Sequence, residues 1–233
     1  MLINSNNHTR VEEDCPELKM LNYPISRTKT YKYLGIIMDE KLSWADHIND
    51  VCMNLSRAAG VFFKVRTLLS RNALMLLYHS LVGQKLRYGL ICWATAPNFL
   101  RQKINVLHDK IVRCINFSKP CCRVKPLYLK LDIQPLDILC EIEWGKIMYK
   151  FQNGMLPRAF DCYFKKPSHR HATRYVSRNN FEQIRTSSAK DHTLLKVIGP
   201  KKWSDVPFEI KKAPYLKTFK KLYTEHLIDI LLR

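Results

Sequence analysis

Glycine is scarce in this sequence, and its few occurrences fit no nucleotide-binding loop. Only 7 of the 233 residues are glycine, less than half of the ~7% that is usual in proteins. No two of them have the spacing of G-x-G-x-x-G, G-x-x-x-x-G-K or G-x-S-x-G. The sequence therefore excludes nucleotide enzymes built on a glycine-rich loop and hydrolases with a nucleophile elbow.

Long apolar runs and a secretory signal are also missing. The longest stretches without Asp, Glu, Lys or Arg cover residues 72–84 and 88–100, which is shorter than the ~18 residues of a membrane span. Residues 1–4 provide neither a basic nor a long apolar leader. The 8 cysteines include no C-x-x-C pair. We therefore expect reduced thiols in a nuclear or cytoplasmic protein that is not secreted.

Basic residues are in large excess. The chain has 39 Lys+Arg against 20 Asp+Glu, a formal charge of +19, and 46% of its residues are hydrophobic. Residues 1–40 carry 5 basic and 6 acidic groups, residues 41–117 carry 11 and 3, and residues 118–233 carry 23 and 11. This composition favours a folded protein with a polyanionic partner, and nucleic acid is the first candidate. We expect no membrane partner, because the basic residues are not gathered on one amphipathic helix.

Hydrophobic periodicity predicts a mostly α protein. Within residues 18–39, an aromatic and β-branched run at Tyr31–Met38 indicates a β-hairpin or a sheet edge. Beyond it the apolar period becomes that of helices, which we expect over about 46–69, 72–93, 97–115, 136–151 and 215–232. Ser43-x-x-Asp46 and Ser70 are the capping signals of the first two helices. The first three helices, joined by short connections, suggest a helical bundle.

Several motifs resemble one family of polymerases. Tyr-Lys-Tyr-Leu-Gly-Ile-Ile-Met-Asp at 31–39, with Leu-Ser-Trp at 42–44 and His-Ile at 47–48, resembles the end of the reverse-transcriptase domain of non-LTR (LINE-type) retrotransposons of the jockey and CR1 kind. Further similar motifs are Leu-Tyr-His-Ser-Leu at 77–81, Leu-Arg-Tyr-Gly at 86–89 with Trp93, His-x-His-x-Thr-Arg at 169–174 and Gly-Pro-Lys-Lys-Trp-Ser-Asp-Val-Pro at 199–207. The last motif departs from the family, in which the tryptophan is more usually followed by asparagine.

The resemblance implies three regions. It places a palm and primer-grip remnant at residues 1–40, a thumb-like helical bundle at 41–117 and a basic helical C-terminal region at 118–233. The alternative for the first region is an ordinary edge strand that ends in a small residue. The residues that match the primer grip, where a glycine lets the backbone approach the primer strand, are Tyr33, Leu34 and Gly35.

The catalytic carboxylates of this family have no match in the sequence. Such polymerases hold two magnesium ions with one palm aspartate and an Asp-Asp pair, and this chain contains no Asp-Asp dipeptide. The residues before Tyr33 are too few to encode fingers and a catalytic palm. We therefore expect no polymerase activity and no cofactor in this chain alone, since Mg²⁺ would belong to the missing palm. The missing fingers and palm portion of the same polyprotein is an expected partner.

The expected function is non-specific binding of RNA, DNA or an RNA–DNA hybrid. A thumb follows the phosphate backbone of a template–primer duplex, whereas the alternative for any one basic residue is a solvated helix face. Binding should weaken steeply as salt rises. The candidate phosphate-binding residues are Lys64, Arg66, Arg71, Lys85, Arg87, Arg101, Lys103, Lys110, Arg113, Arg170, Arg174, Lys201 and Lys202.

Other signals leave alternatives open. Within 146–221, 18 basic residues face 5 acidic ones with aromatic residues between them, which suits single-stranded nucleic acid, although Trp203 is expected in the core. The spacings of Cys and His fit no zinc finger or knuckle, so we expect no metal site. The rival function is a non-enzymatic helical scaffold, or a decayed element product with no nucleic-acid role.

Overall fold

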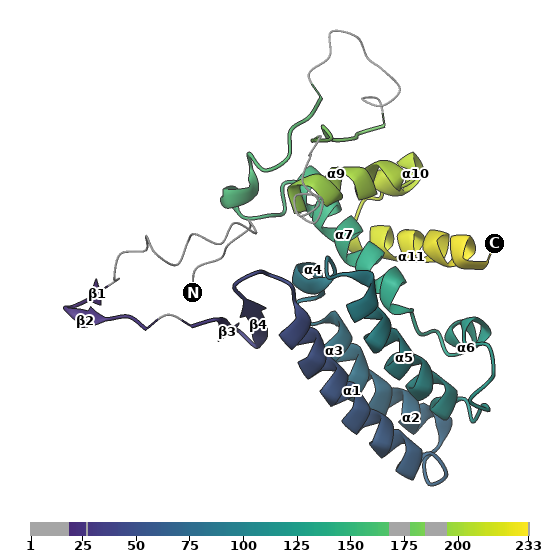
Figure 1. Cartoon of the computed structure of the whole chain (residues 1–233). Coiled ribbons are helices and arrows are strands. Elements are labelled where there is room, and N and C mark those ends of the chain that lie inside the picture. The colour runs from purple at the N-terminus through teal and green to yellow at the C-terminus, as the bar shows by residue number, and fades with distance from the viewer. Residues whose placement is uncertain (1–18, 27, 168–177, 185–194, 233) are drawn as a thin grey trace. The chain divides into compact units, whose positions relative to one another are not determined.

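The structure is a computed structural model (Figure 1) that describes residues 19–26, 28–167, 178–184 and 195–232. Helices make up most of these residues, and two short β-hairpins precede them. The predicted mostly α fold with an N-terminal hairpin is therefore confirmed. The chain forms two compact units, the first from residues 1–89 and 96–127 and the second from residues 90–95 and 128–233.

Two antiparallel hairpins open the first unit (Figure 1). Their strands are β1 (Lys19–Met20) with β2 (Tyr23–Pro24), and β3 (Thr30–Tyr33) with β4 (Ile36–Asp39). Leu34 and Gly35, which connect β3 to β4, have φ of 46° and 82°. Positive φ at both central residues is the signature of the type I′ turn that matches the twist of a hairpin. The Tyr-Leu-Gly motif therefore lies at a hairpin tip.

Helices α1 (Ala45–Val65) and α5 (Asn98–Ile115) form the main packed pair of the first unit. Between them come α2 (Arg71–Tyr78), a π-helical turn (His79–Gly83) and α3 (Gln84–Arg87). Apolar residues three and four positions apart face inward, and the fully buried ones include Ile48, Leu55, Phe62, Leu74, Val82, Leu86, Ile104 and Ile111. The helices predicted over 46–69 and 97–115 are confirmed. So is the cap at Ser70, whose hydroxyl accepts a hydrogen bond from the Ala73 N–H at 3.3 Å.

The single helix predicted over 72–93 is wrong. The backbone of Tyr88 is extended, with ψ of 119°, and Gly89 has φ of 57°. The helix therefore ends at Arg87, and α4 (Leu90–Trp93) begins after the break. Packing against β4 explains why glycine stands there, because a Cβ on Gly89 would lie 2.4 Å from Cδ1 of Ile36.

The predicted cap of the first helix is also wrong. The N-cap of α1 is Trp44 rather than Ser43, with φ of 64° and no capping bond from its own side chain, although the Ser43 hydroxyl accepts a hydrogen bond from the Ala45 N–H at 3.3 Å. Instead, the Asp39 carboxylate accepts hydrogen bonds from the backbone N–H groups of Ser43 and Trp44, each at 3.0 Å. Partial burial raises the pKa of Asp39, but these N–H donors outweigh it and leave the pKa below its ordinary value. The end of the hairpin thus fixes the start of α1.

The second unit is organised around helix α7. Among its described residues the helices are α4, α7 (Leu136–Gln152), α9 (Leu195–Asp205), α10 (Phe208–Lys211) and α11 (Leu216–Leu232), with a 3₁₀ turn at Arg158–Phe160. Helix α7 packs against α4, α9 and α11. The helices predicted over 136–151 and 215–232 are confirmed, as is the core position of Trp203, which is fully buried among the aromatic residues Tyr149, Phe164, Phe181, Phe219 and Tyr223.

Helix α6 (Lys125–Lys130) lies in the connection that follows α5. Sequence periodicity missed α9, because this helix contains Pro200 and has only Gly199, Pro200 and Trp203 buried, a set too small and too irregular to show a period. In the part of the chain that the structure describes, no helix combines the length and apolarity needed to cross a bilayer.

Candidate nucleic-acid interface

The candidate phosphate-binding residues of the first unit lie on the outer surfaces of its helices. Their side chains are exposed or half-buried, and none is in the buried core. The exposed ones are Lys64, Arg71, Lys85, Arg87, Lys103 and Lys110, and the half-buried ones are Arg66, Arg101 and Arg113. Such positions allow contact with a polyanion, and they are also where basic residues lie on any solvated helix.

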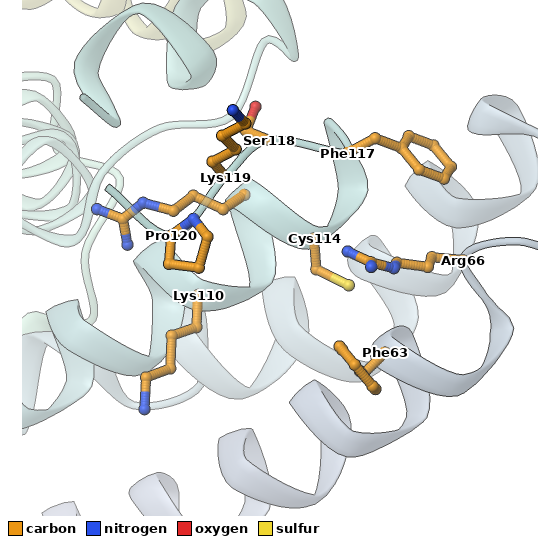
Figure 2. Close-up of a pocket in the computed structure, with 9 residues that line it drawn as sticks. Phe63, Arg66, Lys110, Cys114, Phe117, Ser118, Lys119 and Pro120 are labelled. Carbon is orange, nitrogen blue, oxygen red and sulfur yellow. The ribbon is translucent and has the colours of Figure 1, made fainter. Parts of the chain in front are cut away.

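Three of these residues come together where α1 and α5 end. Arg66 follows α1, whereas Lys110 and Arg113 lie in the last turns of α5, and all three line a pocket of about 500 Å³ (Figure 2). None of the described residues that line it is acidic. The described lining residues are Phe63, Arg66, Lys110, Arg113, Cys114, Phe117, Ser118, Lys119 and Pro120.

Hydrogen bonds hold the arginines around this pocket. The Nε of Arg113 donates to the backbone oxygen of Cys122 at 3.1 Å, and Arg71 donates to the side-chain oxygen of Asn116 at 3.2 Å. The guanidinium of Arg66 lies 5.0 Å from the centre of the Phe63 ring, within cation–π range. These contacts fix the segment after α5 against the helices and present the cations in defined positions.

Cys114 lines the same pocket. Figure 2 shows the Arg66 side chain directed toward the Cys114 sulfur. Burial raises the pKa of this thiol, and the charge and hydrogen bond of Arg66 offset only part of the rise. The thiol is therefore neutral near pH 7 and leaves the positive charge of Arg66 uncompensated.

The residues that match the primer grip lie at the exposed tip of the β3–β4 hairpin. Tyr33 is 58% and Leu34 72% exposed. The Tyr88 hydroxyl donates a hydrogen bond to the backbone oxygen of Leu34, and a Cβ on Gly35 would lie 3.4 Å from the Tyr88 ring. Tyr88 thus positions the tip, and sequence reasoning missed this role although Tyr88 lies in one of the matched motifs.

A small pocket of about 150 Å³ lies beside this tip. It brings Gly35 together with Lys85, another candidate residue, and with His47, Asp50 and Tyr88. The His47 ring is buried, and its Nδ1 accepts the Ile37 N–H at 3.4 Å. Burial lowers the pKa of His47, so the imidazole is neutral near pH 7 and serves to hold β4.

A buried polar pair lies within the helical core of the first unit. Tyr78 and His108 form a hydrogen bond of 2.8 Å between the hydroxyl and Nε2, and both side chains are buried. Burial, followed by the charge of Arg87, lowers the pKa of His108 from 6.5 to about 3. This histidine is neutral and structural. The sequence signal that could have found it is its place on the apolar face of α5, between Ile104 and Ile111.

Basic residues of the second unit divide into exposed and paired ones. Lys201 is exposed, whereas Lys202 forms an ion pair with Glu141 of α7. Lys211, which was not predicted, is 2% exposed and donates to the Asn180 side-chain oxygen at 2.7 Å. Burial, followed by the nearby charge of Arg178, lowers the pKa of Lys211 to about 8. Arg170 and Arg174, with the motif that contains them, lie outside the described residues.

Comparison with curated proteins gives three relatives. The RNA-directed DNA polymerase from mobile element jockey of Drosophila funebris is 29% identical over 145 residues, 60% of this chain and 14% of the relative. The polymerase from jockey of Drosophila melanogaster is 27% identical over 125 residues, 52% of this chain and 14% of the relative. A probable RNA-directed DNA polymerase from transposon X-element of the same species is 22% identical over 103 residues, 43% of this chain and 11% of the relative.

This chain is similar in sequence to RNA-directed DNA polymerases from jockey and X-element. The resemblance to LINE-type reverse transcriptases that the motifs suggested is thereby confirmed. The matched parts span only 11–14% of the length of these relatives. No family model and no solved structure matches the chain.

No metal centre is formed by the residues that the structure describes. No group of three or more His, Cys, Asp or Glu side chains among them lies close enough to hold an ion. Cys162, which the sequence places near the His169-x-His171 motif, is an exposed free thiol, and Cys140 is a buried one. His169 and His171 themselves lie outside the described residues.

Proposed function

We propose that this chain is the thumb-like and C-terminal part of a jockey-type RNA-directed DNA polymerase and binds nucleic acid without sequence specificity. The observation that carries the proposal is the pocket at the ends of α1 and α5, where Arg66, Lys110, Arg113 and Lys119 meet and no described lining residue is acidic. The similarity to polymerases from jockey and X-element supports the same assignment.

The physical basis is the release of counterions. Each Lys or Arg placed against a phosphate frees condensed cations from the nucleic acid, and the gain does not depend on base sequence. Residues 41–117 carry 11 basic groups against 3 acidic ones, so few carboxylates oppose the approach of a phosphate backbone. RNA, DNA and their hybrid all present this backbone, and all three are proposed ligands.

We infer that nucleotide addition to the 3′ end of a primer belongs to another part of the polymerase. Two-metal phosphoryl transfer needs carboxylates close enough to bridge two Mg²⁺ ions, and this chain has no Asp-Asp dipeptide. We infer that the purified chain does not extend a primer when Mg²⁺ and nucleotides are supplied. Template-dependent incorporation in a primer-extension assay would overturn this part of the proposal.

A mobility-shift titration at two salt concentrations tests binding directly. The probe is an RNA–DNA hybrid duplex of about 16 base pairs, comparable to the reach of RNA-binding domains. We expect clear binding at the lower salt concentration and a strong loss of affinity at the higher one. Absence of binding at the lower concentration would favour a helical scaffold with no nucleic-acid role.

A further inference from the structure

The pocket at the ends of α1 and α5 has a feature that duplex binding does not use. Two of its lining residues are exposed aromatic side chains, Phe63 at 68% and Phe117 at 56%. In a duplex the bases are stacked inside, and phosphates and sugars face the protein. Phenylalanine faces next to such a backbone would have nothing to stack on.

The two rings come from different parts of the first unit. Phe63 lies near the end of α1, and Phe117 follows α5 with φ of 55°. Figure 2 shows the Phe117 ring above and the Phe63 ring below the Arg66 side chain. A positive φ is unusual for a bulky side chain, and here it turns the chain after α5 so that the Phe117 ring stays exposed.

Cations line the same pocket as these rings. Arg66, Lys110, Arg113 and Lys119 line the same pocket, and Lys110 and Lys119 are exposed. The pocket volume of about 500 Å³ falls within the ~300–1,000 Å³ of ordinary ligand sites. A single-stranded nucleic acid matches this pattern, because each nucleotide brings one phosphate for the cations and one flat base for an aromatic face.

We propose that this pocket binds an unpaired nucleotide of single-stranded RNA or DNA, with its base stacked on Phe117 or Phe63 and its phosphate among the four cations. The inference rests on the proposed function and deepens it. The cations of the pocket contact phosphates of a duplex or of a single strand, and the inference adds a stacking site for the base of an unpaired nucleotide. An acidic peptide with an aromatic residue is the competing occupant.

The test compares single-stranded and duplex probes on matched variants. The first probe is a fluorescent oligo(U) of about 12 nucleotides, within the range that one single-strand site covers, and the second is a blunt RNA–DNA hybrid of similar length. Phe117→Ala and Phe63→Ala are expected to weaken oligo(U) binding about fivefold or more and to leave hybrid binding unchanged. Phe99→Ala is the control, because Phe99 is also 68% exposed but lies in the first turn of α5.

A second set of variants separates stacking from packing. Phe117→Trp keeps an aromatic face and should retain oligo(U) affinity, whereas Phe117→Leu keeps the size and should lose it. An abasic oligonucleotide of the same length, which keeps the phosphates and lacks the bases, should bind wild type and Phe117→Ala equally. Because Phe117 is more than half exposed, these changes leave the core intact, as circular dichroism can verify.

The outcomes distinguish this inference from the proposed function. If wild type binds the hybrid and Phe117→Ala does not weaken oligo(U) binding, only the unpaired-nucleotide site is refuted. If Phe99→Ala weakens oligo(U) binding as much as Phe117→Ala does, base stacking at this pocket is also refuted. If wild type binds neither probe, both proposals fail. If a Glu-rich, Phe-containing peptide binds the wild type and oligo(U) does not displace it, the pocket belongs to the competing occupant.

Discussion

Substitution of Gly89 by alanine probes the junction between the primer-grip-like hairpin and the helices. Gly89 has φ of 57°, and an L-residue in this conformation costs roughly 1–2 kcal/mol. The added methyl group would also lie 2.4 Å from Cδ1 of Ile36 in β4. Overpacking typically costs about 1–3 kcal/mol, and the lower end applies here because Cδ1 is the far end of the Ile36 side chain, whereas Cγ1 lies at 3.1 Å.

The two costs are expected in two different measurements. The backbone strain persists wherever the hairpin lies, so it should lower the free energy of unfolding in urea by about 1–2 kcal/mol. The crowding against Ile36 is relieved when the hairpin moves away, so amide hydrogen exchange in β3 and β4 should accelerate roughly 5-fold, which corresponds to about 1 kcal/mol.

Gly60→Ala supplies the matched control. Gly60 lies inside α1, and a Cβ there would meet nothing within 4 Å. Alanine at an open helical position should stabilise the protein by about 0.5–1 kcal/mol and leave exchange in the hairpin unchanged. If Gly89→Ala behaves like Gly60→Ala in both assays, the hairpin does not pack on the helix break as described.

Two further predictions concern buried and half-buried charges. The pKa of His108 is about 3 in the folded protein against an ordinary 6.5, so the free energy of unfolding should fall as pH drops from about 7 toward 4, because the unfolded state binds the proton more readily. His108→Gln should flatten this pH dependence in urea titrations at several pH values. An unchanged pH dependence would contradict the buried neutral imidazole. The Lys202 and Glu141 side chains of the ion pair are 38% and 26% exposed, so Lys202→Ala should lower the free energy of unfolding by less than about 1 kcal/mol. A loss of several kcal/mol in thermal or urea unfolding would show that this pair stabilises the fold more than a surface ion pair does.

Local sequence patterns predicted the long helices well. The spacing of apolar residues gave α1, α5, α7 and α11 to within a few residues, because each buries one continuous apolar face. The break at Tyr88 and Gly89 was not predictable in this way, since it depends on the packing of Ile36, more than fifty residues earlier in the chain. The cap of α1 by Asp39 is a similar case, because the hairpin places that carboxylate.

The candidate site was only partly visible in the sequence. The excess of basic residues selected Arg66, Lys110 and Arg113 as separate candidates. Hydrophobic periodicity does not predict that the ends of α1 and α5 lie close together. Phe63, Phe117 and Lys119 of the same pocket were not selected. A signal was present for Phe63, which follows the buried Phe62 and must therefore point away from the apolar face of α1.

The salt dependence of hybrid binding by charge-reversal variants tests the central claim most directly. The logarithm of the binding constant should fall linearly with the logarithm of salt concentration for wild type. In Lys110→Glu/Lys119→Glu the slope should be shallower by about 2, roughly one for each lost phosphate contact. Lys19→Glu/Lys29→Glu, the same charge change on exposed residues of the N-terminal segment, should keep the wild-type slope. Equal slopes in all three proteins would contradict a phosphate-binding surface at the ends of α1 and α5.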